Sequence, residues 1–190
     1  MIKAVIFDCF GVLVGDGLQL VCQDLETSDP EARAFIGDMI YQSNIGALEP
    51  GESGRLISER LGMSETAWRE LVSRGEVRND DAVGLVRSLR GRYQTALLSN
   101  IGKGSLKRRF SDDELAELFD VVVPSAEVGM LKPDPRIYEY TAGQLGVLPE
   151  ECVFIDDREE YVEAAKRVGM RGICFKSAAQ TRRDLEAILY

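Results

Sequence analysis

The sequence predicts an α/β fold in which a parallel β-sheet is interrupted by an inserted block of helices. Ala4–Phe7 is a continuous apolar run, too short for a helix and rich in strand formers, which is typical of a strand buried on both faces. From Asp80 onward, helical and strand patterns alternate, and this alternation indicates a parallel sheet. Between these segments, residues 15–79 carry helical signals only.

The inserted block begins with a break at residues 15–17, Gly-Asp-Gly, and is expected to contain three helices. Their start signals are Asp29-Pro30-Glu31, Pro50-Gly51-Glu52 and Ser64. We expect residues 15–79 to form a small helical domain, and residues 1–14 and 80–190 to form the core domain.

The chain from Asp80 onward is expected to complete the sheet. The expected strands are residues 93–98, 119–123, 152–155 and 172–175. Helices are expected to begin near Asp80, after the capping sequence at Ser111, at Asp134-Pro135, ahead of Val162 and after Ser177. Together with the first strand, this pattern predicts five parallel strands with helices between them.

Composition excludes several classes of partner. The chain is 45% hydrophobic and 29% charged, which is ordinary for a soluble globular protein. A net charge of −9 argues against a nucleic-acid binder, and the basic run Lys107-Arg108-Arg109 is interpreted as a solvated helix face. No apolar run reaches membrane-spanning length, and the apolar start at Ile2 lacks the features of a signal peptide. We therefore expect neither nucleic acid nor a membrane as partner.

Cysteine and histidine usage narrows the chemistry. The four cysteines show no Cys-x-x-Cys spacing, which favours a reduced, cytoplasmic setting. The chain has no histidine, and this excludes Ser-His-Asp and Cys-His catalysis and nearly all catalytic zinc sites. The groups that remain available for catalysis are carboxylates, lysine, hydroxyls and a hard cation.

Polar residues stand where the expected strands end. The first strand ends on Asp8, the second on Ser99-Asn100 and the fourth on Asp156-Asp157, while Lys132 lies just ahead of the helix at Asp134-Pro135. Right-handed crossovers place these ends at one edge of a parallel sheet, where ligands bind. Taken alone, Asp8 is equally well explained as a loop cap. Taken together, these groups fit phosphoryl transfer.

Each of these groups has a use in that chemistry. Two or three carboxylates without thiolate or imidazole suit Mg²⁺. Asp8 can attack phosphorus to form an acyl phosphate, and Lys132 with the cation would offset the charge on the phosphoryl oxygens. Ser99 Oγ, with backbone N–H groups beyond it, would hydrogen-bond a phosphate oxygen. Ser99, Asn100 and Lys132 are therefore the candidate substrate-binding residues.

Four segments, FDCFGVL, LLSN, VGMLKPDP and VFIDD, resemble in order and spacing the four motifs of the haloacid dehalogenase-like (HAD) hydrolase superfamily. The branch with a helical cap inserted after the first strand is the most similar. This resemblance implies a Rossmann-like parallel sheet of order 5-4-1-2-3 with helices on both faces, and a cap domain that closes over the sheet and selects the substrate.

The resemblance also implies roles for individual residues. Asp8 would be nucleophile and metal ligand, and Lys132 would orient Asp8 and the phosphate. The backbone carbonyl of Phe10, together with Asp156, would bind Mg²⁺, and Asp157 would do so directly or through water. The chain departs from the family pattern at Phe10, where phosphatases usually carry a second aspartate that protonates the leaving group. Such general-acid help is worth about 10²–10⁴-fold.

A second departure is Tyr161, where related sequences often have asparagine, and we interpret it as packing the helix against the sheet.

The preferred reading is a Mg²⁺-dependent phosphatase of a small phosphorylated metabolite that acts through an aspartyl-phosphate on Asp8. The alternatives are a catalytically impaired binding protein and a dehalogenase-type C–halogen hydrolase, which has an aromatic residue at the position of Phe10. A mutase is least favoured, because it needs the acid that Phe10 replaces. Candidate substrate-selecting residues are Tyr41, Arg55 and Trp68, each equally explained as core or surface, and the sequence does not indicate an oligomeric state.

Overall fold

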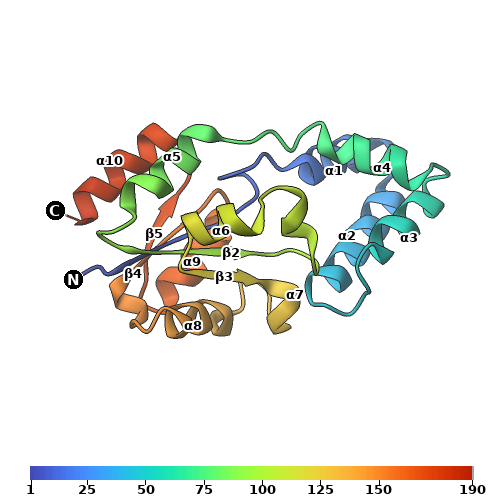
Figure 1. Cartoon of the computed structure of the whole chain (residues 1–190). Coiled ribbons are helices and arrows are strands. Elements are labelled where there is room, and N and C mark those ends of the chain that lie inside the picture. The colour runs from blue at the N-terminus through green and yellow to red at the C-terminus, as the bar shows by residue number, and fades with distance from the viewer. Residues whose placement is uncertain (190) are drawn as a thin grey trace.

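A five-stranded parallel sheet forms the centre of the computed structural model, which describes residues 1–189 (Figure 1). The strands are β1 (Ala4–Phe7), β2 (Gln94–Ser99), β3 (Val121–Pro124), β4 (Cys152–Asp156) and β5 (Arg171–Cys174). Their spatial order is β3-β2-β1-β4-β5, and every neighbouring pair is parallel. This is the predicted order read from the opposite edge, and it confirms the predicted Rossmann-like fold class.

Strand β1 lies at the middle of the sheet, so its end meets the ends of two neighbours. Phe7 is paired with Leu97 of β2 and with Ile155 of β4. Asp8 follows Phe7 directly, and its backbone N–H donates to the carbonyl of Ile155 at 2.9 Å. The register therefore places Asp8 beside the carboxyl end of β4.

Helices cover both faces of the sheet (Figure 1). Val5 and Phe7 of β1 belong to an apolar cluster with α5 (Asp80–Leu89) and α10 (Ala178–Leu189). Ala4 and Ile6 point to the other face and pack in a cluster with α8 (Pro135–Gln144) and α9 (Glu159–Arg167). The remaining elements of the core are η1 (Ser105–Arg108), α6 (Asp112–Leu118), α7 (Ser125–Val128) and η2 (Pro149–Glu151). The alternation of side chains along β1 thus gives each face of the sheet its own apolar core.

Four helices, α1 (Gly17–Ser28), α2 (Pro30–Asn44), α3 (Glu52–Arg60) and α4 (Glu65–Ser73), form a helical unit beyond the end of the sheet (Figure 1). The unit has its own apolar cluster, whose buried members are Val21, Ile36, Ile57 and Trp68. The predicted caps are present, since Asp29 accepts from the N–H of Ala32 and Ser64 from that of Ala67. Helix α1 was not predicted, because Asp16, which caps it by accepting from Gln19 N–H at 2.9 Å, stands between two glycines and was read as part of a break.

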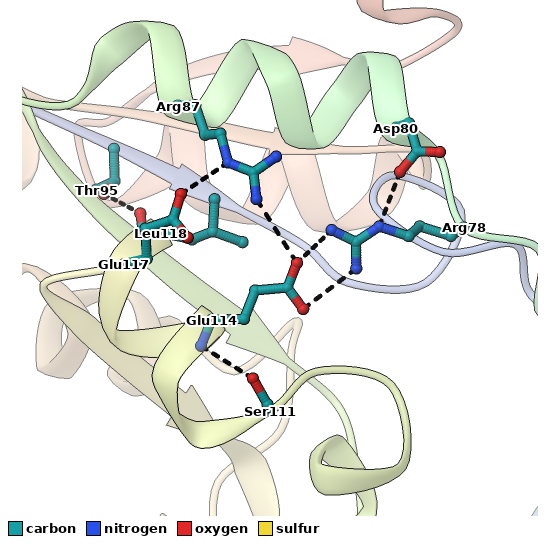
Figure 2. A network of polar contacts seen from close by, with 8 residues as sticks. All are labelled: Arg78, Asp80, Arg87, Thr95, Ser111, Glu114, Glu117 and Leu118. Carbon is teal, nitrogen blue, oxygen red and sulfur yellow. Dashed lines mark hydrogen bonds and ion pairs between the residues drawn. The ribbon is translucent and has the colours of Figure 1, made fainter.

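The segment between α4 and α5 is tied to the core by Arg78 (Figure 2). Its guanidinium donates to both carboxylate oxygens of Glu114 on α6 and to Asp80 at 2.8 Å. Arg87 of α5 reaches Glu117 of α6 at 2.8 Å in the same network. These contacts fix the chain where it returns from the helical unit to the sheet.

Replacing Glu114 by glutamine is expected to lower the free energy of unfolding by about 1 kcal/mol, because a two-pronged contact with the partly buried Arg78 is lost. Glu117→Gln is the matched control, since Glu117 and Arg87 are both exposed, and it should cost less than about 0.5 kcal/mol. Urea denaturation measures both. Equal losses of unfolding free energy in the two variants would mean that the Arg78–Glu114 contact stabilises the segment between α4 and α5 no more than an ordinary surface ion pair does.

None of the helices formed by residues 1–189 is both long and apolar enough to cross a membrane. Cys9, Cys22, Cys152 and Cys174 are free thiols. The cytoplasmic setting inferred from the cysteine pattern stays a prediction.

Candidate active site

Three carboxylates meet at the carboxyl edge of the sheet. Asp8 follows β1, Asp156 ends the neighbouring β4, and Asp157 is the next residue. One oxygen from each lies within 4.8 Å of the others. Asp8 and Asp156 are buried, whereas Asp157 is half-buried. Gly11 (φ +81°) allows the loop after β1 to pass this cluster, because a Cβ there would lie 2.3 Å from the Asp157 carboxyl carbon.

Lys132 lies between the two buried carboxylates. Its Nζ donates to Asp156 Oδ2 at 2.6 Å and lies 2.8 Å from Asp8 Oδ1. Burial alone would lower the pKa of Lys132, but the attraction of Asp8 and Asp156 outweighs it and the pKa is raised above its ordinary value. Lys132 is therefore a buried ammonium that stays charged at neutral pH.

Asn100 and Tyr161 hold Lys132 in place. Asn100 Oδ1 accepts from the backbone N–H of Lys132 at 2.9 Å, and its Nδ2 donates to the Lys132 carbonyl at 2.9 Å and to the Tyr161 hydroxyl at 3.4 Å. The ring centroid of Tyr161 lies 5.0 Å from Lys132 Nζ. Tyr161 also packs in the apolar cluster beneath α8 and α9, as its interpretation from sequence required. The contact with Lys132 was missed, because only the departure from the family pattern marked Tyr161.

Two buried oxygens at this edge have no hydrogen-bond partner among residues 1–189. They are Asp8 Oδ1, whose contact with Lys132 lacks hydrogen-bond geometry, and Ser99 Oγ at the end of β2. Buried polar atoms are nearly always satisfied, so the unpaired Ser99 Oγ at the same sheet edge as the Asp8–Lys132 ion pair indicates a ligand site. Burial raises the pKa of Asp8 to about 7 although Lys132 opposes the shift, and burial followed by the charge of Asp156 raises the pKa of Asp157 to about 6.

The donor set at this edge fits a hard divalent cation. When all three carboxylates are ionised, their charge of −3 and the +1 of Lys132 leave −2. Every free donor is an oxygen, which Mg²⁺ prefers. A divalent cation would favour the ionised carboxylates and would balance the charge that Lys132 leaves uncompensated.

A cavity of about 1260 Å³ extends from these residues toward the helical unit. On the core side it is lined by Asp8, Phe10, Ser99, Asn100, Lys132 and Asp157. From the helical unit, Tyr41 and Trp68 reach it, the first exposed and the second buried. Arg55 does not line the cavity; it is exposed and pairs with Glu59 at 3.3 Å. Of the three candidate substrate-selecting residues, Tyr41 and Trp68 line the cavity, and Trp68 also belongs to the apolar cluster of the helical unit.

A family model described as haloacid dehalogenase-like hydrolase matches residues 2–169 of the chain. The chain belongs to this family. It is a HAD-like hydrolase, and the resemblance read from its four motifs is confirmed.

Relatives of this HAD-like hydrolase differ in length and named activity. The chain is 26% identical to drimenol cyclase drtB of Aspergillus calidoustus, over 99% of this chain and 37% of that protein. It is 28% identical to D-ribitol-5-phosphate phosphatase of Bacteroides thetaiotaomicron, over 100% of this chain and 99% of the relative. The solved structure of the HAD family enzyme bt-2542 from Bacteroides thetaiotaomicron, in complex with magnesium and inorganic phosphate, has a TM-score of 0.73 and 23% identity, covering 93% and 96% of the two chains. The chain thus spans little more than a third of one relative and nearly all of the other two.

In this HAD-like hydrolase, Phe10 is covered by Arg109, whose guanidinium lies 4.7 Å from the ring centroid. Arg109 also forms an ion pair with Glu76, in the segment that follows α4, and donates to the Ser105 carbonyl at 2.7 Å. The interpretation of Lys107-Arg108-Arg109 as a solvated helix face is therefore wrong for Arg109, whose side chain is only 10% exposed. Arg109 turns inward because it pairs with the Glu76 carboxylate and packs on the Phe10 ring, and both residues are far from it in the sequence.

Proposed function

We propose that this chain is a Mg²⁺-dependent phosphatase that acts on a small phosphorylated metabolite through an aspartyl-phosphate on Asp8. The observation that carries the proposal is the Asp8 carboxylate paired with the buried Lys132, together with the unpaired Ser99 Oγ, in the lining of a large cavity. The phosphatase name of a relative that matches over the whole chain supports the reaction type. The magnesium and phosphate in a structure of similar fold support the ligands.

Each side chain at the site has a separate role in the proposed reaction. The Asp8 carboxylate attacks the phosphorus of the substrate, and water then cleaves the acyl phosphate and restores Asp8. Ser99 Oγ donates to one phosphoryl oxygen, and Lys132 offsets charge on another while it holds Asp8 in place. Asp8, the Phe10 carbonyl, Asp156 and Asp157 would hold Mg²⁺, which when bound supplies positive charge against the phosphoryl oxygens.

Substrate choice is proposed to lie in a cap domain of residues 15–79 that covers a core of residues 1–14 and 80–190. Two features support this division. The helical unit packs around its own apolar cluster rather than joining those of the sheet. Tyr41 and Trp68 of that unit line the same cavity as Asp8. Binding in the cavity would therefore place one end of the substrate against each part.

Millimolar Mg²⁺ is expected to raise the melting temperature by about 5 °C, because a ligand of the native state stabilises it by mass action. Asp156→Asn should remove most of this shift. Glu65→Gln is the matched control, since Glu65 lines the cavity outside the carboxylate cluster and its variant should keep the shift. Nitrophenyl phosphate turnover should require Mg²⁺ and should vanish in Asp8→Asn.

The alternatives predict different outcomes. A C–halogen hydrolase would release halide from 2-chloropropionate without Mg²⁺, and the aromatic Phe10 beside Asp8 is the feature that favours it. A binding protein would show no turnover of either substrate. An unshifted melting curve together with no phosphate release would overturn the phosphatase.

A further inference from the structure

Three arginines gather on one side of the cavity, although the chain carries a net charge of −9. Arg108 and Arg109 come from the core after β2, and Arg69 comes from α4 of the helical unit. Among the described residues, Glu76 is the carboxylate that reaches ion-pair distance of this group, and it pairs with Arg109. Arg69 and Arg108 contact only a backbone carbonyl and a serine hydroxyl, respectively. Within residues 1–189, the guanidinium groups of Arg69 and Arg108 therefore have no carboxylate at ion-pair distance.

Arg109 offers a donor that the protein does not use. Its two terminal nitrogens donate to Ser105 and Glu76, and the guanidinium carbon lies over the Phe10 ring. The remaining Nε–H is buried and has no partner among residues 1–189. Because the side chain is nine-tenths buried, leaving this donor unpaired is costly unless a ligand supplies an acceptor.

Repulsion within the group supports an anionic ligand. Partial burial first, and the neighbouring guanidinium of Arg109 second, lower the pKa of Arg108, and Arg69 acts in the same direction. An anion bound between these side chains would relieve that repulsion. The acids Glu65 and Glu70 of α4 also line this cavity, and in the part of the chain that the structure describes neither forms an ion pair with Arg69 or Arg108.

The surroundings of Phe10 restrict the leaving group. Phe10 stands two residues after Asp8 and cannot donate a proton. The guanidinium of Arg109 lies over the Phe10 ring, and an arginine side chain does not act as a proton donor in proteins; the Glu76 carboxylate pairs with Arg109. From the position that Phe10 occupies, an alkoxide leaving group therefore receives no proton, whereas a phosphate leaves as a stable anion without one.

We propose that the substrate is an organic diphosphate, whose terminal phosphoryl group meets Asp8 and whose inner phosphate is bound by Arg109 and Arg108. This inference rests on the proposed phosphatase function and names its substrate class. It joins two features that the reaction alone leaves unexplained: the replacement of the acid by Phe10 and the arginines beside it.

The reaction balances without a proton donor. An oxygen of Asp8 forms a bond to the terminal phosphorus, and the bond from that phosphorus to the bridging oxygen breaks. The bridging oxygen keeps the electron pair and becomes a terminal oxygen of the organic monophosphate, where Arg109 and Arg108 bind its charge. Water then attacks the phosphorus of the aspartyl phosphate, which releases dihydrogen phosphate and regenerates the Asp8 carboxylate.

Hexyl diphosphate and hexyl phosphate test the inference, because they differ only in the leaving group. With Mg²⁺, kcat/KM for the diphosphate is expected to exceed that for the monophosphate by about 100-fold. Arg108→Gln and the charge-balanced double variant Glu76→Gln with Arg109→Gln should each lower diphosphate turnover by about 30-fold. Both should lower nitrophenyl phosphate turnover less than diphosphate turnover, so that the ratio of the two kcat/KM values falls by about tenfold. Lys107→Gln is the matched control, because Lys107 is exposed, pairs with Asp112 and does not line the cavity.

The outcomes separate this inference from the function on which it rests. Equal turnover of the two hexyl esters, or equal losses on every substrate in the arginine variants, would overturn the diphosphate while leaving a phosphatase. A third outcome would also overturn the diphosphate: acetyl phosphate is cleaved as fast as hexyl diphosphate, and Arg108→Gln does not lower turnover of hexyl diphosphate. In that case only the quality of the leaving group would matter. No turnover of nitrophenyl phosphate or acetyl phosphate would instead place the failure in the proposed phosphatase. Melting temperatures of all variants show whether each is folded.

Discussion

Replacing Lys132 by methionine is expected to lower nitrophenyl phosphate turnover by about 10³-fold and the metal-free melting temperature by about 10 °C. The ammonium contacts both Asp8 and Asp156, and all three groups are buried. Removing one partner of a buried ion pair costs about 3–5 kcal/mol, because the remaining charges lose their compensation. The loss in turnover has a second origin, since the substrate phosphate would meet two carboxylates with no fixed cation between them.

Magnesium is expected to restore much of the lost stability in Lys132→Met. Once the ammonium is gone, Mg²⁺ can supply the positive charge that the carboxylate cluster has lost, so the Mg²⁺-dependent rise in melting temperature should exceed that of the unmodified chain. Lys166→Met is the matched control, because Lys166 also pairs with a carboxylate, Glu163, but at the surface. It should change the melting temperature by less than about 2 °C. A Lys132→Met variant that melts and turns over like the Lys166→Met variant would show that Lys132 is not part of the site.

The fold was predictable wherever local signals decide the structure. Strand β1 is a short apolar run, and caps such as Asp29, Ser64 and Ser111 act within three residues, so both are visible in the sequence. Helix α1 was not predicted, because its cap, Asp16, lies between two glycines that suggest a turn. Helix α7 was lost because only four residues form it, too few for a helical pattern.

The candidate site was predictable to the extent that strand order decides it. Once β1 and β4 are neighbours, as the resemblance to the HAD family implies, Asp8 and Asp156 must lie together. The group formed by Phe10, Arg109 and Glu76 depends on contacts between segments far apart in the sequence. No local pattern indicates which arginine of a basic run turns inward. That choice is made by the partners that the fold brings to Arg109.

Replacing Phe10 by aspartate is expected to raise kcat/KM for hexyl phosphate by about tenfold, and by about 100-fold when Arg109→Gln accompanies it. The introduced carboxyl would stand two residues after Asp8, where a proton donor serves an alkoxide leaving group. Alone, it would lie close to the guanidinium that now stacks on the ring, and Arg109 would favour its ionised form, which has no proton to give. With Arg109→Gln, the nearby Glu76 instead raises the pKa of the introduced carboxyl and favours the protonated acid.

Phe10→Asn is the control for this gain, because it has a similar shape and no acidic proton. Nitrophenyl phosphate should gain less than about threefold in every variant, since its leaving group hardly needs a proton. Phe10 is half-buried, so melting temperatures must accompany the kinetics. A folded Phe10→Asp/Arg109→Gln variant that cleaves hexyl phosphate no faster than Phe10→Asn would contradict the claim that a missing proton donor limits this site. In that case the group formed by Arg69, Arg108 and Arg109 would need an explanation that does not involve the leaving group.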